Sequence, residues 1–425
     1  MKNKKSILIS GFALFSMFFG AGNLIFPAYL GNKVGDQYLM ATLGFALSAV
    51  GLVFAGIFAA TKAGGSIEKI SGTISPKFSL IFSTLVMLAI GPGLAIPRTA
   101  ATTVEVIQKG FLANGNTVVL TILFFLVVYF FVRKPSTIID NLGKILTPLL
   151  IITLAVIILK GIISPVASPV DTGQVQVFQS SFEEGYQTMD ALAALVFAVV
   201  VTEGFMAKGI SDYKIIKEYT IKSSIIAALG LCFVYGGLIY LGASSSKLGI
   251  SNMERIDMLL YICYQQLGSF GKLLICLAMA LACLTTAIGL STTVGEYFSQ
   301  LLSEKTKGLI SYDVVVIIST LFSAFFAVVG VEKILTISAP ILSAIYPVAI
   351  VLIFLNLFKE DTFSKNVKIG AIIGVSLYSL LILLNSFSLD FGLLKTIESV
   401  FSDQIKSFIW ILPALIGALT GKIKK

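Results

Sequence analysis

The sequence FFGAGNLIFP occupies residues 18–27, near the middle of a charge-free apolar run from Ser6 to Asn32. A run of this length is sufficient for a transmembrane helix, which needs about 20 apolar residues. Two glycines and an asparagine at that depth contribute nothing to a lipid-facing helix, but non-helical backbone is tolerated where it lines a cavity or is buried in protein. The sequence therefore predicts a helix interrupted at 20–23, with close helix packing through the glycines as the alternative.

The overall composition indicates a polytopic membrane protein. Of the 425 residues, 56% are hydrophobic and only 12% are charged, about half of the ~25% found in soluble chains. Twelve apolar runs without charged residues follow one another along the chain, and most are long enough to cross a bilayer. We expect an all-α fold of twelve transmembrane helices that form a single transmembrane domain, residues 1–425.

The distribution of Lys and Arg predicts the orientation in the membrane. With both termini inside, the inner segments carry about twice as many Lys and Arg residues as the outer segments. This bias favours cytoplasmic termini in the cell membrane, with long outer connections at about 164–190 and 247–270. The net charge is +9, but the Lys and Arg residues are scattered between the apolar runs. This distribution indicates the lipid bilayer and not a nucleic acid as the partner. No obligatory protein partner is evident.

Enzymatic chemistry has little support in this sequence. The chain has no histidine, and its four cysteines lack the spacing of a metal site. The commonest general base and metal ligand is therefore missing. A channel would need rings of charge or repeated filter carbonyls, and the apolar runs contain neither. A carrier for a small solute is the class that fits best.

Glu203 interrupts the sixth apolar run, within VVVTEGF at residues 199–205. An ionisable side chain inside the membrane is costly and is a functional-site hypothesis by default. The structural alternative is that Glu203 pairs with a freed backbone amide or with Lys208. Under either interpretation, the sequence predicts a second interrupted helix near Glu203.

The positions of the two expected interruptions suggest a repeat. Crossings one and six each begin a half of five crossings, at about 6–165 and 188–358, and two extra helices follow at about 367–421. Interrupted helices at corresponding positions mark the binding site of secondary transporters, and an odd number of crossings inverts the second half. Half-helix N-termini attract a carboxylate, and half-helix C-termini attract an ammonium or a small cation. The expected solute is therefore an amino acid.

Two further motifs bear on this site. Thr285 and Thr286 follow Ala282 by about one turn in the eighth run, and this set of neutral oxygens suits a hard monovalent cation. Alternatively, the two hydroxyls bond back to carbonyls of their own helix. The sequence GPG at 91–93 predicts a kink in the third crossing.

Three motifs resemble those of the bacterial branched-chain amino acid:cation symporters (LIVCS-type), namely FFGAGNLIFP at 18–27, GPGLAIPRTA at 91–100 and APILSAIYP at 339–347. The resemblance covers essentially the whole chain. It implies a LeuT-like fold of five plus five inverted helices with two extra helices. It also implies secondary active import of Leu, Ile and Val coupled to sodium or proton entry by alternating access. The alternatives are a symporter for another small neutral or apolar solute, or a channel.

The resemblance also implies a set of site residues. Among the expected substrate-binding residues, the amides of Ala21 and Gly22 would meet the substrate carboxylate, and Asn23 would help to bind a second ion or brace the unwound turn. The remaining expected substrate-binding residues are Val199, Val200, Thr202, Gly204 and Phe205, with the carbonyls of Val199 and Val200 and the Thr202 hydroxyl facing the ammonium. The expected sodium ligands are the carbonyls of Ser16, Phe19 and Ala282 and the hydroxyls of Thr285 and Thr286. Glu203 departs from the apolar residue common at its position, so its role, coupling or structural, stays open. No cofactor is expected beyond the coupling ion.

Overall fold

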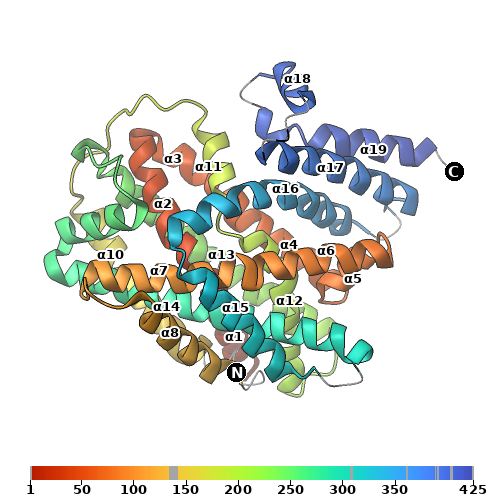
Figure 1. Cartoon of the computed structure of the whole chain (residues 1–425), viewed down its shortest axis with the longest axis horizontal. Helices are drawn as coiled ribbons and strands as arrows, with labels where there is room; N and C mark the ends of the chain where they lie inside the picture. The colour runs from red at the N-terminus through yellow and green to blue at the C-terminus, as the bar shows by residue number, and fades with distance from the viewer. Residues whose placement is uncertain are drawn as a thin grey trace.

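The computed structural model describes residues 2–133, 142–306, 310–359, 362–387, 389, 392–402 and 405–423. Every regular element within these ranges is helical, which confirms the expected all-α class. The helices up to α16 (Val331–Leu357) pack into one bundle, and α17 (Lys365–Ser386), α18 (Leu393–Ser399) and α19 (Ile411–Ile423) stand together at one side of it (Figure 1).

The helical elements of the first half, up to residue 163, include three π-helical segments (η2, η3 and η5) and one 3-10 turn (η1). They are α1 (Lys2–Phe18), α2 (Ala21–Val34), η1 (Gly35–Gln37), α3 (Tyr38–Ala46), η2 (Leu47–Gly51), α4 (Leu52–Lys62), α5 (Ile67–Gly72), α6 (Pro76–Leu88), η3 (Ala89–Gly93), α7 (Ala95–Gly110), α8 (Thr117–Val132), η5 (Leu142–Leu146) and α10 (Thr147–Ile163).

The elements that follow, up to α16, and the short turn before α19 complete the described helices. They are α11 (Val177–Tyr186), α12 (Asp190–Ala207), α13 (Tyr213–Ala243), η6 (Ser246–Leu248), α14 (Arg255–Thr306), α15 (Tyr312–Ala327) and η8 (Lys406–Phe408).

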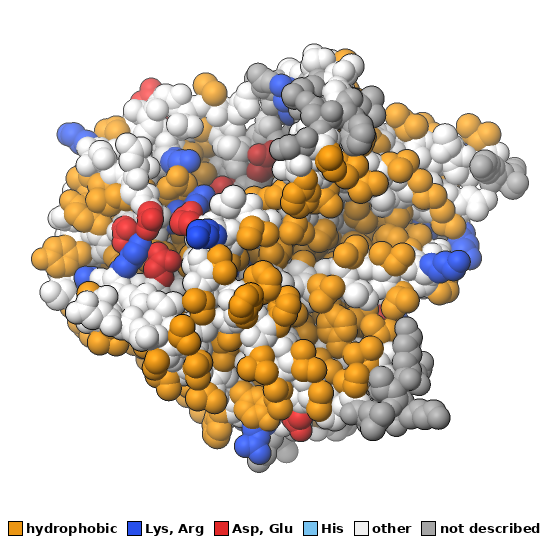
Figure 2. Space-filling view, viewed as in Figure 1, with side chains coloured by type: hydrophobic (Ala, Val, Ile, Leu, Met, Phe, Trp, Pro, Cys, Tyr) orange, Lys and Arg blue, Asp and Glu red, His pale blue; other side chains and the backbone are white. Residues whose placement is uncertain are grey.

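Nine helices or continuous runs of helices in the described ranges are long and apolar enough to cross a membrane. Two further apolar helices, α8 and α15, are shorter than these nine. Large apolar side chains point outward from these elements, for example Leu321 and Phe325, which are 66% and 76% exposed. Apolar side chains accordingly cover the part of this face that lies over α15 and α16, whereas a cluster of charged side chains lies to the left of them (Figure 2). Such a surface suits lipid rather than water. The count of twelve crossings stays a prediction.

The first expected interruption is confirmed. Helix α1 ends at Phe18 and α2 begins at Ala21, so Phe19 and Gly20 form a non-helical link between two half-helices. Gly20 has an extended backbone, with φ −109° and ψ −160°. The kink expected from GPG at 91–93 is also present, because Gly91 leaves helical geometry before Pro92, which cannot donate an amide hydrogen bond.

The second expected interruption lies elsewhere, and the prediction of a break near Glu203 is wrong. Helix α12 runs without interruption from Asp190 to Ala207, and the break falls at 187–189, between α11 and α12. Met189 takes a left-handed conformation there, with φ 67°. Glu203 is exposed one turn before the end of α12. Its charge therefore marks the end of a helix and not a break in the backbone.

The long connection expected at about 164–190 contains the missing half-helix. Helix α11 is only ten residues long and amphipathic, with the sequence VFQSSFEEGY. Its polar residues and its length, well below the ~20 residues of a crossing, hide it from a search for apolar runs. Together, α11 and α12 form an interrupted helix like the pair α1 and α2.

Glycine allows α2 to pack closely against α13. A Cβ on Gly31 would meet the backbone carbonyl oxygen of Ile239, and one on Gly242 would meet the carbonyl oxygen of Ala28. Small residues let backbones approach in this way in membrane helix pairs. The contact fixes α2, which forms one side of the first interruption, against a long continuous helix.

Replacing Gly31→Val is expected to lower thermal stability, because a backbone carbonyl cannot move aside as a flexible side chain can. Overpacking of this kind costs about 1–3 kcal/mol or more. Thermal unfolding of the purified protein in detergent measures the effect. The matched control is Gly72→Val, because a Cβ there would have no neighbour within 4 Å. Equal melting temperatures for the two variants would contradict this account of the contact.

Candidate functional site

The two interruptions face each other across a small cavity, called here the central cavity. Its lining comes from both breaks and from η3, α7, α12 and α14: Met17, Phe18, Gly20, Ala21, Asn23, Ile90, Ala95, Arg98, Thr99, Thr188, Met189, Asp190, Ala193, Phe197, Thr286 and Leu290. The volume is about 20 Å³, roughly the space one water needs. The meeting of two broken helices, which the sequence predicted, is therefore present.

Asn23 closes the first break. Its Oδ1 accepts a hydrogen bond from the backbone amide of Gly20 at 3.0 Å, so a side chain replaces the helical partner that this amide lacks. Gly20 is also required by space, because a Cβ there would lie 2.9 Å from Thr286 Oγ1. The first break therefore packs closely against Thr286 of α14, and Asn23 satisfies the amide that the break leaves free.

Arg98 of α7 closes the second break. Its guanidinium donates to the carbonyl oxygen of Gln187 at 2.6 Å and to that of Thr188 at 3.3 Å. The side chain is only 4% exposed, and its Nε has no hydrogen-bond partner among the described residues. A Cβ on Gly22 would lie 3.2 Å from Arg98 Nη2. The guanidinium therefore lies between the start of α2 and the break before α12.

Asp190 joins the two broken helices to α13. Its Oδ2 accepts from Asn23 Nδ2 at 2.6 Å and from the Tyr235 hydroxyl at 3.0 Å, and Asn23 Nδ2 also donates to Tyr235. All three side chains are at most 3% exposed. Buried polar groups require such partners because leaving them unpaired costs several kcal/mol. Sequence reasoning missed Asp190 because it precedes the sixth apolar run and was assigned to a connection. Its position directly before that run was the available signal.

Oxygens of α1 and α14 converge beside the first break. Thr285 Oγ1 donates to the carbonyl oxygens of Ser16, at 2.8 Å, and Ala282, at 3.0 Å. Thr286 Oγ1 donates to Met17 O at 2.9 Å and contacts Ser16 O at 3.4 Å. The bond to Ala282 is the local one expected as the alternative role, but the bonds to α1 cross between helices.

Four of the five expected cation ligands are therefore together: Ser16, Ala282, Thr285 and Thr286. The Thr286 hydroxyl reaches the carbonyl of Met17, two residues before Phe19, the fifth expected ligand. Thr147 at the start of α10 also donates to Ser16 Oγ at 2.7 Å. Of the expected substrate contacts near the first break, Ala21 and Asn23 line the central cavity, and Gly22 lies between them beside Arg98.

The expected contacts on α12 lie away from the central cavity, because the break precedes them by about three turns. Val199, Thr202 and Glu203 line a separate cavity of about 380 Å³ together with Glu296. The Thr202 hydroxyl bonds back to Val199 O at 2.8 Å, as in an intact helix. The other residues expected there, Val200, Gly204 and Phe205, are continuous helix as well, and Phe205 packs against Tyr219. The described ranges contain no group of three His, Cys, Asp or Glu side chains suited to a metal ion.

The sequence of the chain also matches the profile of a known protein family. The sequence profile described as "Branched-chain amino acid transport protein" matches residues 3–425. The chain belongs to this family of branched-chain amino acid transport proteins. The assignment makes it a multi-pass membrane transport protein and not an enzyme, and it confirms the resemblance seen in the motifs.

Relatives with this family's names align over nearly their whole length. The chain is 38% identical to the branched-chain amino acid permease BraB of Bacillus subtilis, covering 99% of this chain and 95% of that one. It is 36% identical to the branched-chain amino acid transport system 2 carrier protein of Pseudomonas aeruginosa, with 98% and 95% covered.

Solved structures similar to this family member share the LeuT-like fold. A Na⁺-coupled sialic acid symporter matches with a TM-score of 0.63 at 15% identity, covering 98% of this chain and 90% of that one. MhsT in complex with L-phenylalanine matches with a TM-score of 0.57 at 15% identity, with 97% of each chain covered. At these identities the likeness concerns the fold alone.

The replacement Asn23→Ala is expected to destabilise this transport protein by about 1.5–3 kcal/mol, because the Gly20 amide and the Asp190 carboxylate both lose a buried partner. Thermal unfolding in detergent measures this. Asn116→Ala is the matched control, because the Asn116 side chain also accepts hydrogen bonds from backbone amides, at the exposed start of α8. Loss of such a helix cap costs about 1 kcal/mol. A melting temperature for Asn23→Ala above that of Asn116→Ala would contradict the bridging role.

Proposed function

We propose that this chain is a secondary active symporter that imports Leu, Ile and Val together with sodium by alternating access. The observation that carries the proposal is the meeting of two broken helices around Arg98 and Asp190, which places opposite charges in one buried site. The names of the relatives support the substrate class. The Na⁺-coupled symporter among the structural neighbours supports the ion.

The substrate carboxylate is placed at the N-terminus of α2. The first amides of α2, at Ala21 and Gly22, have no helical acceptor, and the positive end of the helix dipole favours an anion there. Arg98 adds the guanidinium whose Nε lacks a partner in the described chain. A guanidinium can bind a carboxylate through two parallel hydrogen bonds. Together these groups form a carboxylate site between α2 and α7.

The substrate ammonium is placed at the second break. The carbonyls at the end of α11 and the carboxylate of Asp190 supply negative charge there, and Asn23 holds that carboxylate in place. These groups take the role that Val199, Val200 and Thr202 were expected to play. Phe18, Ile90 and Phe197 line the same cavity, and such an apolar wall favours a branched aliphatic side chain over a polar one.

The sodium ion is placed between α1 and α14. The carbonyls of Ser16 and Ala282 and the hydroxyls of Thr285 and Thr286 form a set of neutral oxygens of the kind a hard cation prefers. When an ion is bound, each hydroxyl would present its lone pairs to the ion and turn its proton away from the Ser16 carbonyl. Because the ion would fix α14 against the first break, it would strengthen substrate binding, and by linkage the substrate would strengthen ion binding.

The proposed architecture has twelve crossings. The two interrupted helices, α1 with α2 and α11 with α12, each count as one crossing, and each begins an inverted half of five. The second half would then begin at α11, at Val177, and not at about residue 188, and α17 and α19 are the two extra crossings. The Lys and Arg bias supports cytoplasmic termini in the cell membrane. A central cavity of about 20 Å³ is too small for leucine, so transport requires the two halves to move apart on alternate sides.

Thr285→Ala combined with Thr286→Ala is expected to abolish sodium-driven leucine uptake in proteoliposomes while the protein still inserts. The reason is that two of the proposed ion ligands are lost. The matched control is Thr292→Ala with Thr293→Ala in the same helix, because those hydroxyls donate to Ile288 O and Gly289 O of α14 itself and not to α1. Undiminished uptake by the first pair rejects the ion site. Uptake driven by a proton gradient and not by a sodium gradient rejects sodium as the coupling ion.

Arg98→Gln is expected to raise the KM for leucine by about 10- to 100-fold, because a charged hydrogen bond to the carboxylate contributes about 1.5–3 kcal/mol. Arg98→Lys should recover only part of this, since a lysine lacks the planar fork. The readout is the initial rate of labelled leucine uptake against concentration. Arg133→Gln, at the exposed end of α8, is the control. A lowered maximal rate with unchanged KM would assign Arg98 a purely structural role.

A further inference from the structure

Helices α17 and α19 form a groove at the side of the molecule, away from the two interruptions (Figure 1). The helices run antiparallel, because the start of α17 lies against the end of α19. The space along the pair has a volume of about 1020 Å³. Its lining comes from both helices and from one residue of α18: Asn366, Ile369, Gly370, Ile373, Gly374, Leu377, Tyr378, Leu381, Ile397, Pro413, Ile416, Gly417, Thr420, Gly421 and Ile423. We call it the α17–α19 groove. It has no part in the function proposed above.

Glycines at the contact between α17 and α19 explain the shape of the groove. A Cβ on Gly370 would meet the carbonyl oxygen of Gly417, and a Cβ on Gly417 would meet that of Gly370. Backbones approach this closely where small residues face each other, so these positions supply no side chain to fill the space along the contact. The long side chains beside it are exposed, because Ile373, Leu377 and Ile416 keep 54%, 61% and 60% of their surface. The groove therefore has a floor of backbone and walls of aliphatic side chains.

The surroundings of the groove are expected to be hydrocarbon. Both helices belong to segments that are long and apolar enough to cross a membrane, Lys365–Ser386 and Lys406–Ile423. The lining residues of α17 extend from Asn366 to Leu381, about 22 Å of helix at 1.5 Å per residue, and the hydrocarbon core of a bilayer is about 30 Å thick. Lipid acyl chains are therefore the molecules available to fill the groove. Because such chains are as apolar as leucine, packing alone does not select one lipid over another.

Positive charge at one end of the groove supplies a basis for selection. Lys365 is the first residue of α17, Lys422 lies in the last turn of α19, and both are exposed. The contact of Gly421 with the carbonyl oxygen of Asn366 brings the two lysines to the same end of the groove. The N-terminus of α17 lies there too, and the positive end of its dipole favours an anion. An anionic headgroup at this end would meet positive charge from both walls.

We propose that the α17–α19 groove binds an anionic phospholipid of the surrounding bilayer, with one acyl chain along the glycine contact and its phosphate between Lys365 and Lys422. Charge complementarity selects this occupant, because lysines at the membrane surface attract anionic lipids. A second copy of the chain, related by a two-fold axis along the membrane normal, would bring its own two lysines to the same end and oppose them with like charge. With the cytoplasmic termini proposed above, the lipid belongs to the inner leaflet.

Native mass spectrometry of the full-length protein tests the proposal. The delipidated protein in detergent is titrated with phosphatidylglycerol and, separately, with phosphatidylcholine that carries the same acyl chains. We expect the first phosphatidylglycerol to bind at least ~5-fold more tightly than the first phosphatidylcholine, because only its headgroup has a net negative charge for the lysines to attract. Equal affinity for the two lipids overturns the proposal.

Lysine variants locate the headgroup. Lys365→Gln combined with Lys422→Gln should reduce the affinity for phosphatidylglycerol to that for phosphatidylcholine and leave the latter unchanged. The matched control is Lys77→Gln with Lys214→Gln, because these lysines are exposed near the starts of α6 and α13, outside the groove. A preference that survives in the first pair, or that is lost equally in the control pair, overturns the proposed headgroup position.

Two further substitutions test the occupant of the groove itself. Thr420→Phe fills part of the groove and should weaken phosphatidylglycerol binding at least ~5-fold, whereas Leu419→Phe, on a neighbouring position that does not line it, should not. Equal binding by these two variants overturns the placement of the acyl chain. Leu377→Cys is tested for crosslinking between copies in native membranes, against the background of the unchanged chain with its exposed Cys232. Crosslinking above that background would show that a second copy fills the groove, and it overturns the proposal. None of these readouts depends on uptake.

Discussion

Peptide groups at the two interruptions lack helical partners, and the surrounding membrane offers them no water. An unpaired amide or carbonyl in such surroundings costs several kcal/mol, so each break survives only where another group satisfies it. Asn23 serves the Gly20 amide, and Arg98 serves the carbonyls of Gln187 and Thr188. Most of the arrangement around the central cavity follows from this requirement, because the satisfying groups must come from helices held in fixed positions.

The same groups link the interruptions into one unit. Asp190 receives hydrogen bonds from Asn23 on α2 and from Tyr235 on α13, and Thr285 on α14 binds the Ser16 carbonyl on α1. A movement of either half-helix therefore disturbs partners on the other half and on the flanking helices. This gives a physical route by which the ion proposed beside α1 and the amino acid proposed between the breaks would affect each other's binding. The coupling is local, since all these groups surround one small cavity.

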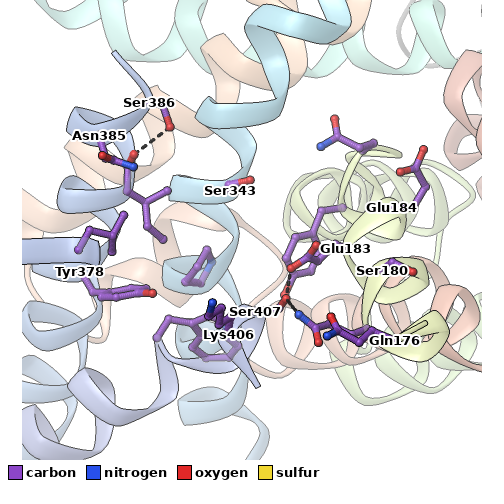
Figure 3. A pocket seen from close by; sticks show the side chains of 17 residues that line it. Gln176, Ser180, Glu183, Glu184, Ser343, Tyr378, Asn385, Ser386, Lys406 and Ser407 are labelled. Atoms are coloured by element: carbon purple, nitrogen blue, oxygen red, sulfur yellow. Dashed lines mark hydrogen bonds between the residues drawn. The ribbon is translucent and has the colours of Figure 1, made fainter. Parts of the chain in front are cut away.

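The extra helices change the surroundings of the second break. Tyr186, the last residue of α11, and Gln187 line a cavity of about 750 Å³ between α11, α16 and α17 (Figure 3), while the next residues, Thr188 and Met189, line the central cavity. One short segment thus separates two cavities of very different size. The aromatic contact of Phe182 with Phe408 ties this segment to the residues before α19, and Tyr186 stacks on Tyr346 of α16. The position of α11 therefore depends on both the bundle and the C-terminal helices.

The sequence by itself determined the all-helical class, the family, the first interruption and most of the proposed cation ligands. Each of these depends on local signals: long apolar runs, GAG followed by Asn23, and a Thr pair one turn after Ala282. Only the tertiary structure located the second interruption, because α11 is short and amphipathic and Met189, a non-glycine residue, makes the turn. Only it identified Arg98 and Asp190 as site residues, since their burial and partners come from helices far apart in the chain. The break predicted near Glu203 was wrong because a charged residue in an apolar run can mark either a broken helix or the end of a helix. The local sequence does not distinguish these two cases.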